Sequence, residues 1–199
     1  APALCCAMLS LAGTLQAATF SEFVDPHSAP GNQFGATVVA LSTGNVVITS
    51  PFDDAGGVDA GAVYLFNGAT GALISTLRGS TAHDFVGYGG VTALSNGNYV
   101  VLSPNWDDGP LAAPYAGAAT WGSGTTGVSG VVSAANSLVG STASDNVGSV
   151  VTALSNGNYV VSSHFWNNGA AGYAGAATWG SGTTGVSGVV SAANSLVGS

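Results

Sequence analysis

The chain contains very few charged side chains. Only 5% of its 199 residues are charged, and Arg78 is the single basic residue against eight Asp and one Glu. A protein that binds nucleic acid neutralises phosphates with several Lys or Arg, and binding to an anionic membrane surface needs basic residues too. The composition therefore argues against both partners, and solubility must come from Ser, Thr, Asn and exposed backbone.

Cysteine is almost absent as well. Cys5 and Cys6 are adjacent, which disfavours a disulfide between them, and both lie in the apolar, uncharged stretch 3–15. Such a stretch is typical of a signal peptide and is shorter than the roughly 20 residues that span a bilayer, although a buried first strand or helix is an alternative. We predict a signal-peptide remnant at 1–17, a leader at 18–33, and an extracellular or cell-surface mature chain without membrane insertion or thiol chemistry.

Helix-forming residues are scarce, whereas repetition is extensive. Residues 115–141 recur without a change at 173–199, and residues 91–101 recur at 151–161. A diverged third copy precedes them. With 31 glycines and almost no Lys, Arg or Glu, the repeated unit is expected to be built from strands. We predict three repeats, at 34–86, 87–146 and 147–199.

Each copy contains four short apolar runs separated by Gly, Asn, Ser or Pro, which is typical of strands and turns. In the second copy these runs are 91–94, 98–103, 117–121 and 137–140. Ser95-Asn96-Gly97 joins the first two, and its Asn-Gly pair indicates a tight primed hairpin turn with positive φ at both central residues. The pattern predicts an all-β fold of tandem four-stranded blades in a partial β-propeller, with a β-solenoid as the alternative. Three blades are fewer than the usual minimum of about four, so we expect a truncated array with further repeats or self-association.

The first copy resembles a known family of repeats. Its segments 34–38, 48–51 and 61–66 (FGATV, ITSP and GAVYLF) are similar to the FG-GAP repeats of integrin α-subunit propellers. The later copies also resemble, less specifically, repeats of bacterial filamentous-haemagglutinin-like surface proteins. The resemblance implies an extracellular propeller used for binding or adhesion. The family's calcium loop between its first two strands is not matched, because Ser, Thr, Asn and Gly occupy that place in all three copies.

Acidic residues form one dense group, Asp53, Asp54 and Asp59. Several carboxylates could contribute to a Ca²⁺ site, since this cation takes six to eight oxygen ligands. The pair Asp53–Asp54 aligns with 107–108 and with 167–168, where Asn replaces both acids, and this interchange favours a turn role. We predict no metal and no cofactor, with Ca²⁺ at these three residues as the weaker alternative.

The loops after the second run differ between copies and are the candidate ligand site. Loops on a rigid scaffold carry much of protein function, and aromatic side chains dominate many contacts. We expect the tryptophans of these loops to form an exposed platform with nearby tyrosines and acids, whereas Trp121 and Trp179 should pack between blades. The predicted ligand-binding residues are Trp106, Asp107, Asp108, Tyr115, Trp166 and Tyr173.

No arrangement of nucleophile, base and acid is apparent, so we predict no catalytic residue and no enzyme. Asp84 and Asp145 occupy one repeat position and are expected to be turn or cap residues. The predicted function is a secreted or surface-displayed propeller that binds a protein or glycan. One alternative is a structural spacer or stalk of a larger surface protein, and the other is a propeller-type hydrolase.

Overall fold

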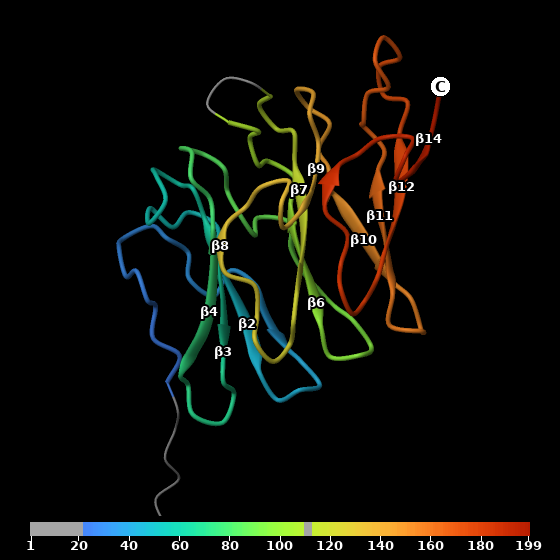
Figure 1. The fold of residues 1–199 in the computed structure, drawn as a ribbon. Coiled ribbons are helices and arrows are strands. Elements are labelled where there is room, and N and C mark those ends of the chain that lie inside the picture. Colours follow the sequence, from blue (N-terminus) through green and yellow to red (C-terminus); the bar gives the residue numbers. More distant parts are fainter. Residues whose placement is uncertain (1–21, 110–112) are drawn as a thin grey trace, which may run out of the picture.

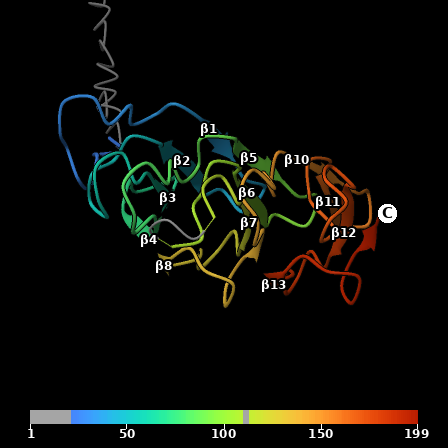
Figure 2. The ribbon, with the colours of Figure 1, turned by 90° about the horizontal axis from the view of Figure 1, so that it is seen from above.

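A computed structural model describes residues 22–109 and 113–199. The expected signal-peptide remnant, 1–17, lies outside these ranges, as do the start of the leader and Pro110 of the second variable loop. The described residues form strands and no helix, arranged in two sheets of five strands and one of four. Figure 1 shows the three sheets following one another along the chain, and Figure 2 shows them side by side in an open row. The prediction of an all-β fold of tandem blades is confirmed.

Each repeat contributes four strands to its own sheet, and successive strands in that sheet are antiparallel. The first sheet contains β1 (Val38–Ala40), β2 (Val46–Ser50), β3 (Ala62–Phe66) and β4 (Leu73–Arg78). The second contains β5 (Gly90–Ala93), β6 (Tyr99–Ser103), β7 (Ala118–Gly122) and β9 (Leu138–Val139). The third contains β10 (Val150–Ala153), β11 (Tyr159–Ser163), β12 (Ala176–Gly180) and β14 (Leu196–Val197). These strands match the four apolar runs predicted for each copy.

Two further strands join the sheet of the repeat before their own. The short β8 (Gly130–Val131) of the second repeat pairs with β4, and β13 (Gly188–Val189) of the third repeat pairs with β9, both in parallel. The backbone N–H of Val190 extends the second pairing with a hydrogen bond of 3.0 Å to the carbonyl oxygen of Val139. We call β8 and β13 the lent strands, because each completes the edge of a neighbouring sheet. The sequence did not predict them.

The hairpin between β5 and β6 differs in detail from the prediction. The N–H of Gly97 donates to the carbonyl oxygen of Leu94, and the N–H of Leu94 donates to that of Asn98. Gly97 has a φ of 87°, whereas Asn96 does not have a positive φ. The predicted pair of positive φ values is therefore wrong, because the loop has one more residue than a two-residue primed turn, and only its Gly is left-handed.

The hydrophobic core lies between the sheets. Val63 and Leu77 of the first repeat pack against Tyr99 and Val101 of the second. The opposite face of β6, represented by Val100, packs against the third repeat. Alternate side chains of a strand point to opposite faces, so β6 is buried on both. None of the described residues belongs to a helix long and apolar enough to cross a membrane.

One cross-strand pair shows how the sheets adjust to their neighbours. Tyr99 lies directly opposite Gly122, and a Cβ at Gly122 would collide with the tyrosine ring. Tyr159 and Gly180 repeat this pair in the third sheet. In the first sheet the large side chain is on the other strand, where Phe66 is opposite Val46. In each of these pairs, one strand supplies the aromatic side chain and the other supplies a smaller residue.

Candidate functional site

The predicted site residues lie at one end of the molecule, which we call the loop end. It consists of the described parts of the β2–β3, β6–β7 and β11–β12 connections, residues 51–61, 104–117 and 164–175. These connections extend from the upper end of the sheets in Figure 1, opposite the short hairpins. Because strands of equal direction in stacked sheets end on the same side, corresponding loops of successive repeats are neighbours.

The two tryptophans of these loops are buried, and the expected exposed platform is wrong in this respect. Trp106 is 4% exposed and Trp166 is 6% exposed. Each belongs to a core cluster between two sheets, and each accepts through its carbonyl oxygen a hydrogen bond from a glycine N–H at the start of the next strand. Although each tryptophan follows the end of a strand, burial of its large apolar indole ring favours a position between the sheets.

In the first repeat an acid takes the place of these tryptophans. The carbonyl oxygen of Asp53 accepts a hydrogen bond from the N–H of Gly61, as that of Trp106 does from Gly117. The sequence alignment of Asp53–Asp54 with residues 107–108 was therefore displaced by one residue. Asp54 is the true counterpart of Asp107, and Phe52 is the counterpart of Asn105.

Asp54, Asp107 and Asn167 have one shared structural role. Their Oδ1 atoms accept backbone N–H groups across the loop at 2.8, 2.7 and 3.1 Å. The three donors, Asp59, Tyr115 and Tyr173, have φ values of 53°, 55° and 55°. An amide oxygen serves as well as a carboxylate for this contact, which explains the change of Asp to Asn. Each of these three side chains thus closes its loop through a backbone hydrogen bond.

Asp53 is fully buried beside the first sheet. Its carboxylate accepts hydrogen bonds from the Tyr64 hydroxyl at 2.6 Å and from the Ala55 N–H at 2.8 Å, and His27 Nδ1 lies 3.2 Å away. Burial and, secondarily, the bond to Asp53 raise the pKa of Tyr64 well above its usual range. In the part of the chain that the structure describes, no three His, Cys, Asp or Glu side chains are grouped as metal ligands. Asp53, Asp54 and Asp59 thus do not form such a group.

Two other buried acids connect consecutive repeats. Asp84 Oδ2 accepts the N–H groups of Ser80 and Thr81, each at 2.8 Å, and its Oδ1 lies 3.4 Å from the N–H of Asp107 in the next loop. Asp145 makes the corresponding contacts one repeat later. Burial raises the pKa of Asp84, although these donors act in the opposite direction. The prediction that both residues are turn or cap residues is confirmed.

Accessible aromatic side chains gather in two places, one beside the loop end and one within it. Between the first and second repeats, the Phe52 ring packs edge-on against Phe85 at 5.4 Å and against Tyr88 at 6.3 Å, and Tyr88 is 56% exposed. In the third repeat, Phe165 contacts Tyr173 edge-on at 6.0 Å, and both are exposed. We call these the first and second aromatic groups.

Sequence analysis found only part of these groups. It named Tyr173 and its counterpart Tyr115, both of which are exposed, but missed Phe52, Phe85 and Phe165. Phe52 and Phe165 share a repeat position that Asn105 occupies in the second copy. This change between copies, at a position next to a buried tryptophan or its replacement, is the signal that could have identified them.

A comparison with known families identifies the repeated unit. A family model described as a repeat of unknown function (DUF5650) matches the chain three times, at residues 40–88, 93–149 and 153–199. The three matches fall on the three sheets. A search of curated proteins found no match to the chain.

Proposed function

The chain belongs to the DUF5650 repeat family, and we propose that it is a secreted or cell-surface protein that binds a ligand through its loop end. In this proposal the stacked sheets act as a rigid scaffold without catalytic activity. The resemblance of the first repeat to FG-GAP propeller repeats and the apolar segment 3–15 support an extracellular, adhesive role.

The observation that carries this proposal is the difference between the repeats at the loop end. Repeats two and three share 27 identical residues after their variable loops, so their strands β7 and β12 and the following turns are the same. Exposed Tyr173 is repeated as Tyr115, but the other exposed aromatic residues are not repeated in this way. Phe165 has Asn105 as its counterpart, and Tyr88 has Ser149. Positions that differ on an identical scaffold are those where a ligand would be recognised.

The chemistry of the loop end favours an uncharged ligand surface. Aromatic rings offer apolar faces that suit sugar rings and protein side chains, and the net charge of -8 disfavours acidic ligands. A neutral glycan or a protein surface of low charge therefore fits best. The absence of enzymatic activity is supported by the roles of the loop acids, because Asp53, Asp54 and Asp107 accept hydrogen bonds that shape the backbone.

The proposal is tested by removing the second aromatic group. The double variant Phe165→Ser/Tyr173→Ser should lose at least 10-fold in affinity for the neutral glycans or cells that the unaltered protein retains on a glycan array or in a cell-adhesion assay. Tyr115→Ser is the matched control, because it changes the same repeat position at a place where the described residues include no aromatic ring in contact. It should keep most of the affinity.

One structural observation favours a second candidate, a spacer. The repeats stack through extensive cores and lent strands, which is the construction of an element that sets a length. If the double variant binds as well as the unaltered protein, or if the unaltered protein is retained by no glycan or cell, the loop-end proposal is wrong and the spacer is favoured.

A further inference from the structure

Each sheet has one face toward the repeat before it, its N-face, and one toward the repeat after it, its C-face. On the C-face of the second sheet, Val100 and Leu138 are fully buried and Ala119 nearly so. The third repeat covers them with Tyr159 and Val161 in a shared core cluster. The C-face of a repeat is therefore made to receive another sheet.

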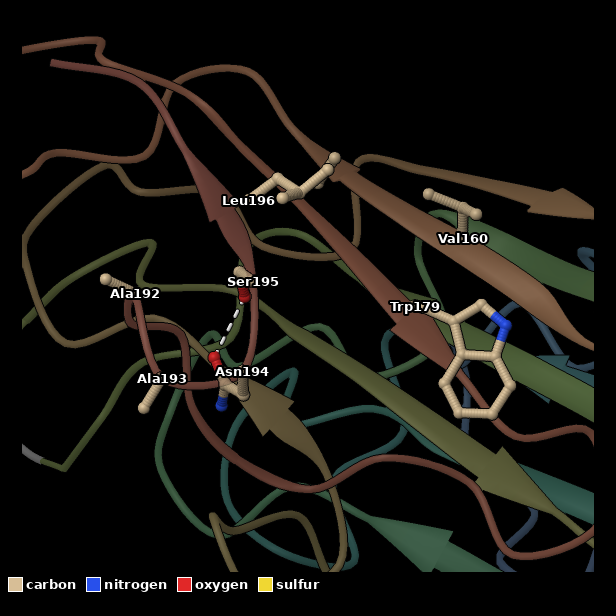
Figure 3. A pocket seen from close by; sticks show the side chains of 8 residues that line it. Val160, Trp179, Ala192, Ala193, Asn194, Ser195 and Leu196 are labelled. Atoms are coloured by element: carbon tan, nitrogen blue, oxygen red, sulfur yellow. Dashed lines mark hydrogen bonds between the residues drawn. The ribbon is translucent and has the colours of Figure 1, made fainter.

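The third repeat presents the same face uncovered. Its counterparts of those residues are Val160, Ala177 and Leu196, with Trp179 beside them. Leu196 is 82% exposed and Trp179 is 56% exposed. With Asn194 and Ser195 they line a hollow of about 390 Å³, shown in Figure 3. Residues 173–199 are identical to residues 115–141, so the two faces have the same chemistry and differ only in their cover.

The edge of the third sheet is also unpaired among the described residues. In the first two sheets the last strand of the repeat, β4 or β9, pairs on its outer side with a lent strand. The corresponding strand, β14, is the edge of its sheet. An unpaired edge next to an exposed apolar face offers backbone hydrogen bonds and hydrophobic contact to the same partner.

The covering repeat also makes polar contacts with the second repeat, through the turn that follows its strand β12. The carbonyl oxygen of Gly182 accepts hydrogen bonds from Trp121 Nε1 at 3.1 Å, from Asn96 Nδ2 at 2.7 Å and from Asn98 Nδ2 at 2.8 Å. Trp179, Asn156 and Asn158 are the third-repeat counterparts of these three donors. A docking sheet with a turn like the one that contains Gly182 could accept the same hydrogen bonds from the third repeat.

The opposite end of the array is partly covered. On the N-face of the first sheet, Phe23 and Phe34 pack over Tyr64 and Phe66, and the buried Asp53 replaces the tryptophan of the other repeats. Val38 and Leu73, whose strand partners belong to this face, remain exposed. A second copy of this chain thus offers only a partly covered N-face for head-to-tail docking, with Val46 at the position of Tyr159. The array has a capped end and a receptive end.

We propose that the C-face of the third repeat is a docking surface for one further sheet of this repeat family. The incoming sheet uses an N-face of the kind found in repeats two and three, with a tyrosine at the position of Tyr159, and its lent strand pairs with β14. This surface is separate from the loop end and does not depend on the function proposed there.

The test attaches such a sheet to the full chain. A second copy of residues 142–199 is added after Ser199, and Leu196→Cys is introduced with Cys5→Ser and Cys6→Ser, so that one thiol reports on the C-face. The rate of its reaction with a maleimide should fall at least about 100-fold on extension, as expected for a group that becomes buried in a stable interface. Leu138→Cys is the matched control and should react slowly in both proteins.

A second variant separates docking from mere attachment. Tyr159→Asp in the added copy places a charge in the interface and should restore the fast reaction of the thiol at position 196. The proposal is overturned if that thiol reacts equally fast with and without the extension while the one at position 138 stays protected. It is also overturned if the unextended chain protects position 196 increasingly with protein concentration, because the occupant is then a second copy.

Discussion

The pair Leu138 and Leu196 allows a direct measurement of what one repeat contributes to the stability of another. The two residues occupy the same position in identical 27-residue segments, yet Leu138 is fully buried and Leu196 is 82% exposed. Both are changed to alanine in separate variants of the full chain. Because the local sequence and strand are the same, any difference in the free energy of unfolding comes from the covering repeat.

The expected difference is large. Truncation of a buried leucine to alanine costs about 2–5 kcal/mol, because the loss of transfer free energy is added to that of a cavity. The same truncation at an exposed position usually stays within about 0.5 kcal/mol. For a slope of about 3 kcal/mol per molar urea, a loss of about 3 kcal/mol at Leu138 lowers the unfolding midpoint by about 1 M.

The assay is urea unfolding followed by tryptophan fluorescence and circular dichroism at several protein concentrations. Equal and small losses at both positions would show that the third repeat does not cover Leu138 in solution. Equal and large losses would show that Leu196 is covered as well, and a dependence on protein concentration would then identify a second copy as the cover. The first result would refute the stacking described for these repeats, and the second would refute the exposure of Leu196.

Three further changes probe the junctions and strand pairs. Asp84→Ala should lower the free energy of unfolding, measured in urea, by about 2–3 kcal/mol, because buried N–H donors lose their acceptor. Asp84→Asn keeps one acceptor oxygen and should cost less, so equal losses for the two variants would contradict this explanation. Gly122→Phe alone should be strongly destabilising, because the new ring collides with Tyr99. Adding Tyr99→Val should recover much of the lost stability, since the pair then matches Val46 and Phe66 of the first sheet. Additive effects in a double-mutant cycle would show that the two side chains do not compete for the same space. Burial raises the pKa of Tyr99 and of Tyr159 to about 12, so between pH 10 and 12 only the unfolded state loses these protons. Stability should therefore fall with rising pH by about 1.4 kcal/mol per pH unit for each tyrosine, measured by urea unfolding, and a flat profile would show that the rings ionise freely.

The strands were predictable because their signals are local. Apolar runs bounded by Gly, Asn and Ser identify β6 and β7 without any knowledge of their partners, and repetition makes the assignment in one copy support the others. The role of Asp84 and Asp145 was predictable for the same reason, since residues at one repeat position face equivalent backbone groups.

The lent strands were not predictable because pairing partners are a property of the whole fold. Gly130–Val131 is a two-residue strand, and nothing in its local sequence distinguishes pairing with β4 of the preceding sheet from pairing within its own. The same limit applies to Trp106, whose loop position suggests exposure although an adjacent sheet encloses it. The one-residue displacement of Asp53 arose because two neighbouring acids look alike in sequence but differ in hydrogen bonding.

The lent strands have a consequence for the order in which the chain folds during synthesis. A ribosome delivers the capped first sheet before β8 exists, so this sheet keeps an open edge until residues 130–131 have emerged. The second sheet waits in the same way for β13 at residues 188–189. Each of the first two repeats is thus completed by its successor, so its folding finishes about one repeat later in translation.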